Sequence, residues 1–392
     1  MKAGWSLASI GEVCEVVNGG TPKTGVSDYW GGQHQWITPA EMGKRSTPYV
    51  SQTARTITDQ GLQNSSAQPL PPLSVILSSR APIGHLVINT EPMATNQGCK
   101  GLVPRASINH KFLYYYLGSI VDLLNDLGSG ATFKELSGGK LKEVPIPLPP
   151  LPEQHRIVTL LDEAFDGIAT AKANAEKNLQ NARAIFESHL QSVFTQRGGE
   201  WAEKRLADVC AITSTLVDPR KAEFIDLTHV GAGNIESKTG AFVELKSARE
   251  EGLISGKFLF DESMVLYSKI RPYLMKVARP DFNGLCSADM YPLAPIPGEA
   301  DRDYLFHLLL SQQFTDYAIE GSARAGMPKV NREHLFEFRV FMPSVCRQRE
   351  IAARFDELKG DTQRLESIYQ QKLDALDELK KSLLHSAFNG DL

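Results

Sequence analysis

LPEQHRIVTLLDEAFDGIATAKANAEKNLQNARAIFESHLQSVF, residues 151–194, is the stretch of this chain that decides its fold. Apolar or small residues recur through it in steps of three and four, which is the pattern of a long helix that buries one face. Pro152 suits the first helical turn, and Glu153 suits the positive end of the helix dipole. At about 1.5 Å per residue such a helix is roughly 65 Å long, which is longer than a small domain is wide. The predicted buried stripe consists of Ile157, Leu161, Ala164, Ile168, Ala171, Ala175, Leu179, Ala182, Phe186, Leu190 and Val193.

A second stretch of the same kind lies at 345–388. Its anchor residues follow those of the first at a constant offset of 194, so that Gln154 aligns with Gln348 and Ile157 with Ile351. Each stretch follows a proline-rich extended segment. We therefore predict a second long helix at the end of the chain.

The similarity between the two halves extends beyond the helices. Residues 10–14 (IGEVC) match 206–210 (LADVC), and 75–80 (VILSSR) resemble 265–270 (VLYSKI). A repeat with a period of about 195 residues indicates a tandem domain duplication, because solenoid repeats are far shorter.

The halves agree at their starts, ends and helices, and they diverge over 18–110 and 214–300. A shared frame with divergent middles is typical of equivalent modules that recognise different things. We expect four parts: globular domains at 1–150 and 197–344, a central long helix at 151–196, and a C-terminal long helix at 345–392.

Mixed helices and strands are predicted within each globular domain. Residues 74–77 predict a buried strand that leads into the small polar loop 78–84, and 109–127 predict one amphipathic helix. Glycines and prolines mark further polar loops at 18–24 and 95–101. A further flexible loop is predicted at 128–136. In the second half the loops at 268–273 and 321–329 match those at 78–84 and 128–136.

The composition is that of an ordinary globular protein. A chain of 392 residues allows two or three domains, and its hydrophobic and charged fractions are 42% and 22%. Neither a signal peptide nor an apolar run near 18 residues is found, so we expect a cytoplasmic protein. The formal net charge of −4 requires that any DNA-binding residues be localised, or that a partner supply positive charge.

The cysteines favour neither disulfides nor a zinc site. They number five, and no C-x-x-C spacing occurs among them. Cys14 and Cys210 occupy equivalent positions of the repeat inside apolar runs. We expect both thiols to be buried for packing.

No catalytic motif emerges from the sequence. The SGGK run at 137–140 lacks the first glycine of a P-loop, and neither a G-x-S-x-G elbow nor an H-E-x-x-H spacing occurs. Asp226 with Glu244 and Lys246 imitates a metal-dependent nuclease triad, but such a scatter arises by chance in most sequences. An Asn-Pro-Pro-Tyr methyltransferase motif is also absent. The sequence therefore predicts a non-catalytic chain that binds no metal.

Several of these features together resemble a known family. The PLPPLPEQ run at 147–154, the module starts at Trp5 and Trp201, and the strand-to-loop segments at 75–80 and 265–270 resemble specificity subunits of type I restriction-modification systems. The resemblance covers the whole chain. In the second helix Cys346-Arg347 replaces Pro152-Glu153, which leaves the start of that helix open.

This resemblance implies an α/β (α+β) architecture of two target recognition domains separated by two long antiparallel helices that form a coiled coil. Each domain reads one half-site of a bipartite, asymmetric DNA target, and the helices set the spacer and dock the modification subunits. The chain itself is non-catalytic and binds no cofactor. Two modification subunits with S-adenosylmethionine supply adenine methyltransferase activity, and restriction subunits with ATP and Mg supply motor and nuclease activity.

Candidate DNA contacts are polar or basic residues on loops with little steric bulk. Arginine and lysine pair with guanine edges or phosphates, asparagine and glutamine suit adenine, and serine and threonine bind either. The alternative for each candidate is a solvated charge or a polar group that stabilises a turn. Arg80 and Lys269 are expected on equivalent loops. The candidates are Thr21, Lys23, Ser79, Arg80, Gln97, Lys100, Thr132 and Lys134 in the first module, and Ser268, Lys269, Arg271, Arg324 and Lys329 in the second.

Two other functions stay open from the sequence. One is a self-contained DNA-modifying or DNA-cleaving enzyme, which methylation or cleavage by the purified chain alone would demonstrate. The other is a coiled-coil scaffold without a DNA role, which a lack of DNA affinity in the presence of partner subunits would favour.

Overall fold

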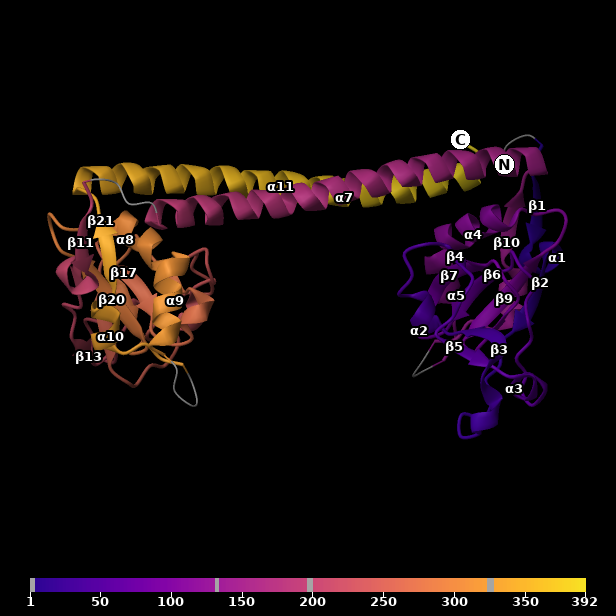
Figure 1. Cartoon of the computed structure of the whole chain (residues 1–392), viewed down its shortest axis with the longest axis horizontal. Coiled ribbons are helices and arrows are strands. Elements are labelled where there is room, and N and C mark those ends of the chain that lie inside the picture. Colours follow the sequence, from indigo (N-terminus) through magenta and orange to yellow (C-terminus); the bar gives the residue numbers. More distant parts are fainter. Residues whose placement is uncertain (1–3, 131–133, 196–199, 323–327) are drawn as a thin grey trace. The chain divides into compact units, whose positions relative to one another are not determined.

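The computed structural model describes residues 4–130, 134–195, 200–322 and 328–392. The chain folds as two compact units, one formed by Met1–Ala175 with Gln371–Leu392 and the other by Glu176–Gln370. Each unit therefore combines one globular module with parts of both long helices, α7 and α11 (Figure 1). The four-part division expected from the sequence describes the chain differently and stays a prediction.

The two long helices are α7 (Leu151–Thr195) and α11 (Val345–Asn389), of 45 residues each. In the first unit they run antiparallel, with Lys172 Nζ 2.6 Å from Asp377 Oδ1. In the second unit they again run antiparallel, with Arg183 Nε 3.2 Å from Glu366 Oε2. Within the described residues, no helix combines the length and the apolarity needed to cross a membrane. The apolar stripe predicted for α7 is confirmed as its buried face, most fully at Ile157, Leu161, Ile168, Ala175, Ala182 and Leu190.

Gln154 fastens the start of α7 to the first module. Its side chain is fully buried, and Oε1 accepts a hydrogen bond of 2.8 Å from the Asn109 N–H. Nε2 donates to the carbonyl oxygens of Ser107 (3.0 Å) and Pro149 (2.8 Å). Asn109 also caps helix α4 (His110–Ser119), so one buried amide joins the start of α7 to the start of α4.

Gln348 repeats this arrangement in the second module. Its Oε1 accepts from the Asp301 N–H at 2.8 Å, and its Nε2 donates to Glu299 O (3.0 Å) and Pro343 O (2.9 Å). Asp301 caps helix α8 (Arg302–Leu309), as Asn109 caps α4. The second long helix therefore starts at the expected place, although its first turn lacks the proline and glutamate of α7.

The first module contains two sheets. The main sheet has the order β2-β9-β6-β7-β4 and the smaller one the order β5-β3-β8. The residues of β6 are all buried, as predicted for the strand near 74–77. The strands are β2 (Cys14–Asn18), β3 (Trp30–Ile37), β4 (Tyr49–Val50), β5 (Arg55–Ile57), β6 (Val75–Ser79), β7 (Ile83–Asn89), β8 (Met93–Thr95) and β9 (Cys99–Pro104).

One helix prediction was wrong in this module. The segment 109–127 forms two helices, α4 and α5 (Val121–Leu127), because the backbone leaves the helical region at Ile120 with φ −114° and ψ 20°. Gly118 and Ser119 precede the break, and both are weak helix formers. The break lets both helices contact β7.

The second module has the same connectivity with different elaborations. Its main sheet has the order β12-β20-β17-β18, and its second sheet the order β13-β16-β19-β14-β15. The parallel pair β3 and β8 of the first module corresponds to the parallel pair β14 and β19 of the second. The divergent middle regions of the two modules thus share a common set of paired strands and differ in the strands that are added to this set. The strands are β12 (Cys210–Ala211), β13 (Leu216–Val217), β14 (Thr228–Val230), β15 (Lys246–Ser247), β16 (Lys257–Phe260), β17 (Val265–Ser268), β18 (Val277–Ala278), β19 (Gly284–Cys286) and β20 (Met290–Pro295).

A two-stranded ribbon joins the start and end of each module. β1 (Ser6–Ser9) pairs antiparallel with β10 (Pro145–Leu148), and β11 (Ala202–Arg205) pairs antiparallel with β21 (Arg339–Met342). Cys14 and Cys210 follow these ribbons and are each 1% exposed, which confirms the predicted packing role. Burial raises the pKa of both thiols to about 12. The remaining helices are α1 (Ile10–Val13), α2 (Pro39–Met42), α3 (Asp59–Gln63), α6 (Gly138–Glu143), α9 (Gln312–Glu320) and α10 (Arg332–Phe336), with short 3-10 turns at Ser27–Tyr29, Leu206–Asp208, Ala232–Asn234 and Pro272–Leu274.

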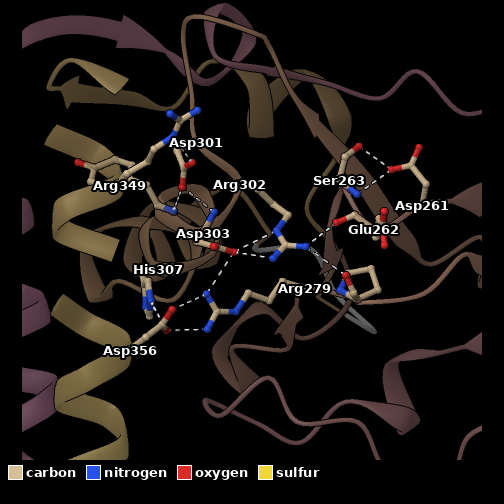
Figure 2. Close-up of polar contacts among 12 residues, drawn as sticks. Asp261, Glu262, Ser263, Arg279, Asp301, Arg302, Asp303, His307, Arg349 and Asp356 are labelled. Atoms are coloured by element: carbon tan, nitrogen blue, oxygen red, sulfur yellow. Dashed lines mark hydrogen bonds and ion pairs between the residues drawn. The ribbon is translucent and has the colours of Figure 1, made fainter. Parts of the chain in front are cut away.

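A partly buried ionic network fastens the second module to α11 (Figure 2). Both ends of the Arg279 guanidinium donate to the Asp356 carboxylate, at 2.6 and 2.8 Å, and His307 Nε2 lies 3.0 Å from Asp356 Oδ1. Burial alone would raise the pKa of Asp356, but the hydrogen bonds from His307 and Arg279 hold it well below its usual range. His307 is fully buried, and burial lowers its pKa.

The first module uses the carboxylate at the corresponding helix position, Asp162. Asp162 Oδ2 lies 2.6 Å from Lys111 Nζ, and Oδ1 accepts a hydrogen bond from the Tyr115 hydroxyl. Both modules are thus held by one aspartate of a long helix, although the partners of that aspartate differ.

The C-terminal end of α11 completes the core of the first unit. The Phe388 ring lies 5.2 Å from the rings of Phe112 and Tyr116, centroid to centroid. Arg156 of α7 donates a hydrogen bond of 2.7 Å to the main-chain oxygen of Leu392. Residues from opposite ends of the sequence therefore share one hydrophobic core.

Candidate nucleic-acid interface

Three segments that are distant in the sequence meet at the end of β6 in the first module. The Ser79 N–H donates to Gly98 O at 2.8 Å, and the Leu136 N–H donates to Ser79 O at 2.9 Å. The end of β6, the turn before β9 and the segment after the 128–130 loop therefore lie side by side. We call residues 79–80, 96–100 and 134–136 the first junction.

The second module builds the same junction at the end of β17. The Lys269 N–H donates to Asp289 O at 3.0 Å, and the Val330 N–H donates to Lys269 O at 2.8 Å. The Arg271 N–H adds a bond of 2.9 Å to Pro328 O. We call residues 268–271, 287–290 and 328–330 the second junction.

Basic side chains converge on one carboxylate in the first junction. Arg80 Nη1 lies 3.5 Å from Glu135 Oε2, and Lys100 Nζ lies 4.0 Å from Glu135 Oε1. The Lys100 side chain is only 8% exposed, whereas that of Glu135 is 42% exposed. Burial lowers the pKa of Lys100, and the neighbouring Glu135 charge opposes this effect.

The second junction also holds one carboxylate beside two basic side chains, with different residue types. Lys269 Nζ and Lys329 Nζ lie 3.7 and 3.5 Å from Asp289 Oδ1. Lys269 Nζ also donates to the Ala288 carbonyl and lies 5.2 Å from the centre of the Tyr291 ring. Burial lowers the pKa of Lys269, Lys329 lowers it further, and Asp289 opposes both.

The structure brings most of the candidate DNA-contact residues of the first module to the first junction. The Thr21 hydroxyl donates to Gln97 Oε1, which links the loop after β2 to the turn before β9. Lys134 is exposed beside Glu135. Lys23 is exposed on the loop after β2, and its carbonyl oxygen accepts from Trp30 Nε1 at 3.3 Å.

Not every candidate is presented to solvent. Ser79 and Ser268 are 0% and 2% exposed, and Ser268 Oγ donates to Ile270 O at 3.2 Å. Arg271 is exposed, with a left-handed backbone at φ 49°. Thr132 and Arg324 lie outside the described residues. The DNA-contact assignment of all the candidates stays a prediction.

Arg80 and Lys269 lie in equivalent junctions but not at equivalent residues. Arg80 forms an isolated bridge with Glu135, and Ile270 forms the corresponding bridge with Lys329. Lys269 therefore corresponds to Ser79, one residue earlier on the strand. The positive charge is kept at the junction while its exact backbone position shifts by one residue.

Sequence reasoning missed Glu135 and Asp289, because it searched for basic and amide side chains that bind DNA directly. Neither acid has a local signal, since each meets its partners only through tertiary contacts.

The possible nuclease triad is not assembled around Asp226. Its carboxylate pairs with the Arg249 guanidinium through contacts of 2.8 and 3.1 Å. Across the described ranges, no group of three or more His, Cys, Asp or Glu side chains is placed to hold a metal ion.

Known proteins are similar to this chain in sequence. The type I restriction enzyme MjaIX specificity subunit of Methanocaldococcus jannaschii is 31% identical over 57% of this chain and 55% of that protein, so the chain spans about half of this relative. The EcoDI specificity subunit of Escherichia coli is 29% identical over 73% of this chain and 70% of that protein.

Two solved structures share the fold of the chain. The HsdS subunit from Thermoanaerobacter tengcongensis has a TM-score of 0.66 at 16% identity, covering 100% of this chain and 98% of that one. A chain from a study of complex assembly and conformational transition of the type I R-M system has a TM-score of 0.77 at 17% identity, covering 100% and 99%.

The family assignment rests on matches in both halves. Residues 2–180 and 198–375 each match the type I restriction modification DNA specificity domain. These matches cover both modules and most of both long helices, in agreement with the resemblance noted in the sequence. The chain therefore belongs to the type I restriction-modification DNA specificity family and carries two copies of its domain.

Proposed function

We propose that this chain is the non-catalytic DNA-specificity subunit of a type I restriction-modification complex. Each module reads one half-site of a bipartite, asymmetric DNA target. The observation that carries this proposal is the duplicated junction, at which two basic side chains from separate segments converge in each module. Such a loop cluster on a sheet scaffold is suited to contact phosphates and base edges together.

Specific roles follow from the chemistry of the side chains. Arg80 is suited to a bidentate contact with guanine, whereas Lys100, Lys269 and Lys329 present single ammonium groups to phosphates or to guanine acceptors. Gln97 is suited to adenine through its amide. Both junctions lie at the end of the equivalent strand, β6 or β17, which supports two modules that bind DNA in the same way but read different bases.

The long helices and the partner proteins complete the proposal. The helices set the spacer between the half-sites and dock two modification subunits. Those subunits bind S-adenosylmethionine and methylate adenine, and restriction subunits use ATP and Mg to translocate and cleave DNA. The complex acts in the cytoplasm, where the genomic DNA of a bacterial or archaeal cell lies.

Mapping of methylated adenines in a genome with and without this gene tests the proposal. We expect one bipartite methylated motif to disappear on deletion and to return when the gene is restored. An unchanged methylation map would contradict the proposal. Methylation or cleavage by the purified chain alone would instead identify a self-contained enzyme, and an assembled complex without DNA affinity would identify a scaffold.

A further inference from the structure

Both junctions hold one carboxylate between two basic side chains, but the charges come from different segments. In the first junction the acid, Glu135, lies on the 134–136 segment, and the bases lie at the end of β6 and the start of β9. In the second junction the acid, Asp289, lies in the turn before β20. The bases there are Lys269 at the end of β17 and Lys329 on the 328–330 segment.

The backbone hydrogen bonds show that the acid has changed position between the modules. Glu135 and Lys329 are equivalent residues, because each forms the isolated bridge to the end of its strand. Gly98 and Asp289 are equivalent, because the carbonyl of each accepts the hydrogen bond from the strand end. An acid of one module thus aligns with a lysine of the other, yet in each junction one acid lies within ion-pair distance of two basic side chains.

The acid controls how strongly the junction attracts DNA of any sequence. Two neighbouring cations without a counter-ion attract every phosphate, and such binding carries no sequence information. Within the cluster formed by the acid and its two basic partners, the carboxylate lowers the net positive charge from two to one, and it repels a phosphate that approaches the same point. The Glu135 and Asp289 side chains are 42% and 47% exposed, so both carboxylates are accessible from solvent.

We propose that Glu135 and Asp289 are specificity-determining residues that weaken the binding of each module to DNA of the wrong sequence. The inference rests on the proposed DNA-reading function. Each carboxylate holds its two basic partners in the absence of the correct half-site. Base contacts in the correct half-site supply the free energy that moves these partners onto the DNA.

The variants Glu135→Gln and Asp289→Asn remove the negative charge while they keep the size of the side chain. Glu203→Gln is the matched control, because it makes the same charge change at an exposed ion pair with Arg339, on strands β11 and β21 and outside both junctions. Each variant is purified as the assembled complex through a tag on this chain. Its affinity is measured over a salt series for a duplex with the mapped target and for a scrambled duplex of equal length.

We expect each junction variant to bind the scrambled duplex about three- to tenfold more tightly, with a steeper salt dependence and a lower ratio of target to scrambled affinity. The control should leave this ratio unchanged. An unchanged ratio in both junction variants, or an equal fall in the control, would overturn the inference. Weaker target binding with unchanged scrambled binding would also overturn it, because the acid would then contact a base. If the wild-type complex did not distinguish the duplexes, the proposed function would fail together with the inference.

Discussion

One buried glutamine in each module makes the same contacts, although the residues around it differ between the modules. Gln154 and Gln348 keep the same three hydrogen bonds, although the residues before them differ. A buried amide is stable only when its donors and acceptors find partners, and here the partners are backbone groups that change little between modules. The glutamine is therefore required by the joint between helix and module, whatever DNA the module reads.

Replacement of Gln154 by leucine should destabilise the first unit by at least ~2 kcal/mol, because one N–H and two carbonyl groups lose their buried partner. Gln348→Leu should do the same to the second unit. Denaturant unfolding with hydrogen exchange resolved for each unit measures both effects. Gln180→Leu, at an exposed position of α7, is the control and should change stability by less than about 0.5 kcal/mol. Equal stability of Gln154→Leu and this control would show that the buried amide is not needed.

The stability of the second unit should depend on pH through His307. Burial lowers the pKa of His307 in the folded chain, so the unfolded chain binds the proton more readily. Stability should therefore fall as the pH falls through the ordinary histidine pKa of about 6.5. The depressed pKa of Asp356 adds a separate loss below its unfolded value of about 3.9.

The control for this pH effect is His307→Gln, which keeps a hydrogen-bond donor but does not titrate. Thermal unfolding at pH 7.5 and 5.5 should show a smaller loss of stability in the variant than in the wild type. His229, whose pKa burial also lowers, contributes to both proteins and cancels in the comparison. Equal losses in the two proteins would exclude His307 as the source.

Arg80→Ala distinguishes a base contact from a phosphate contact. Loss of a bidentate base contact should weaken target binding by about 1–3 kcal/mol and relax one position of the recognised site. A uniform loss over all sequences with a shallower salt dependence would assign Arg80 to phosphate. Arg364→Ala, at an exposed arginine of α11, controls for the lost charge. Unchanged binding by Arg80→Ala would remove this residue from the interface.

At the scale of elements, the features that could be predicted from the sequence are those that depend on residues close together along the chain. The apolar stripe of α7 and the matching starts of α7 and α11 could be predicted, because helix periodicity and motif order are local properties of the sequence. The separation of α4 from α5 was missed because two weak helix formers inside an apolar pattern do not by themselves show where a helix ends. The ion clusters of the junctions were missed because Arg80 meets Glu135 only after the sheet has formed.

An insertion in α7 tests whether this element sets the spacer. Four residues added after Ala175 form about one turn, lengthen the helix by roughly 6 Å and nearly preserve the apolar stripe. Since DNA rises about 3.4 Å per base pair, the preferred spacer should grow by one or two base pairs while both half-sites stay the same. Methylation of a library with randomised spacer lengths measures the preference.

An insertion of two residues is the matched control, because it rotates the stripe by about 200° and should destabilise the helix pair. An unchanged spacer preference in a folded and active four-residue variant would contradict a spacer role for the helices.

At the scale of the whole molecule, the modules should be exchangeable readers. Replacement of residues 1–150 by the same region of a relative should change one half-site and leave the other, because the second junction is untouched. The exchanged region does not contain its whole core, because Phe388 of α11 packs on Phe112 and Tyr116 of residues 1–150. A second chimera that also exchanges 371–392 should be more stable and recognise the same new target. A change in both half-sites would show that the modules do not read independently.

The same packing has a consequence for protein synthesis. The first unit needs residues 371–392 for its core, so the module that a ribosome translates first has its hydrophobic surface covered last. A nascent chain must emerge almost to residue 392 before this unit closes, whereas the second unit, Glu176–Gln370, is contiguous and can fold earlier. A message that is cut short before the codon for residue 371 therefore yields a chain whose first unit lacks part of its core and exposes apolar surface to chaperones and proteases.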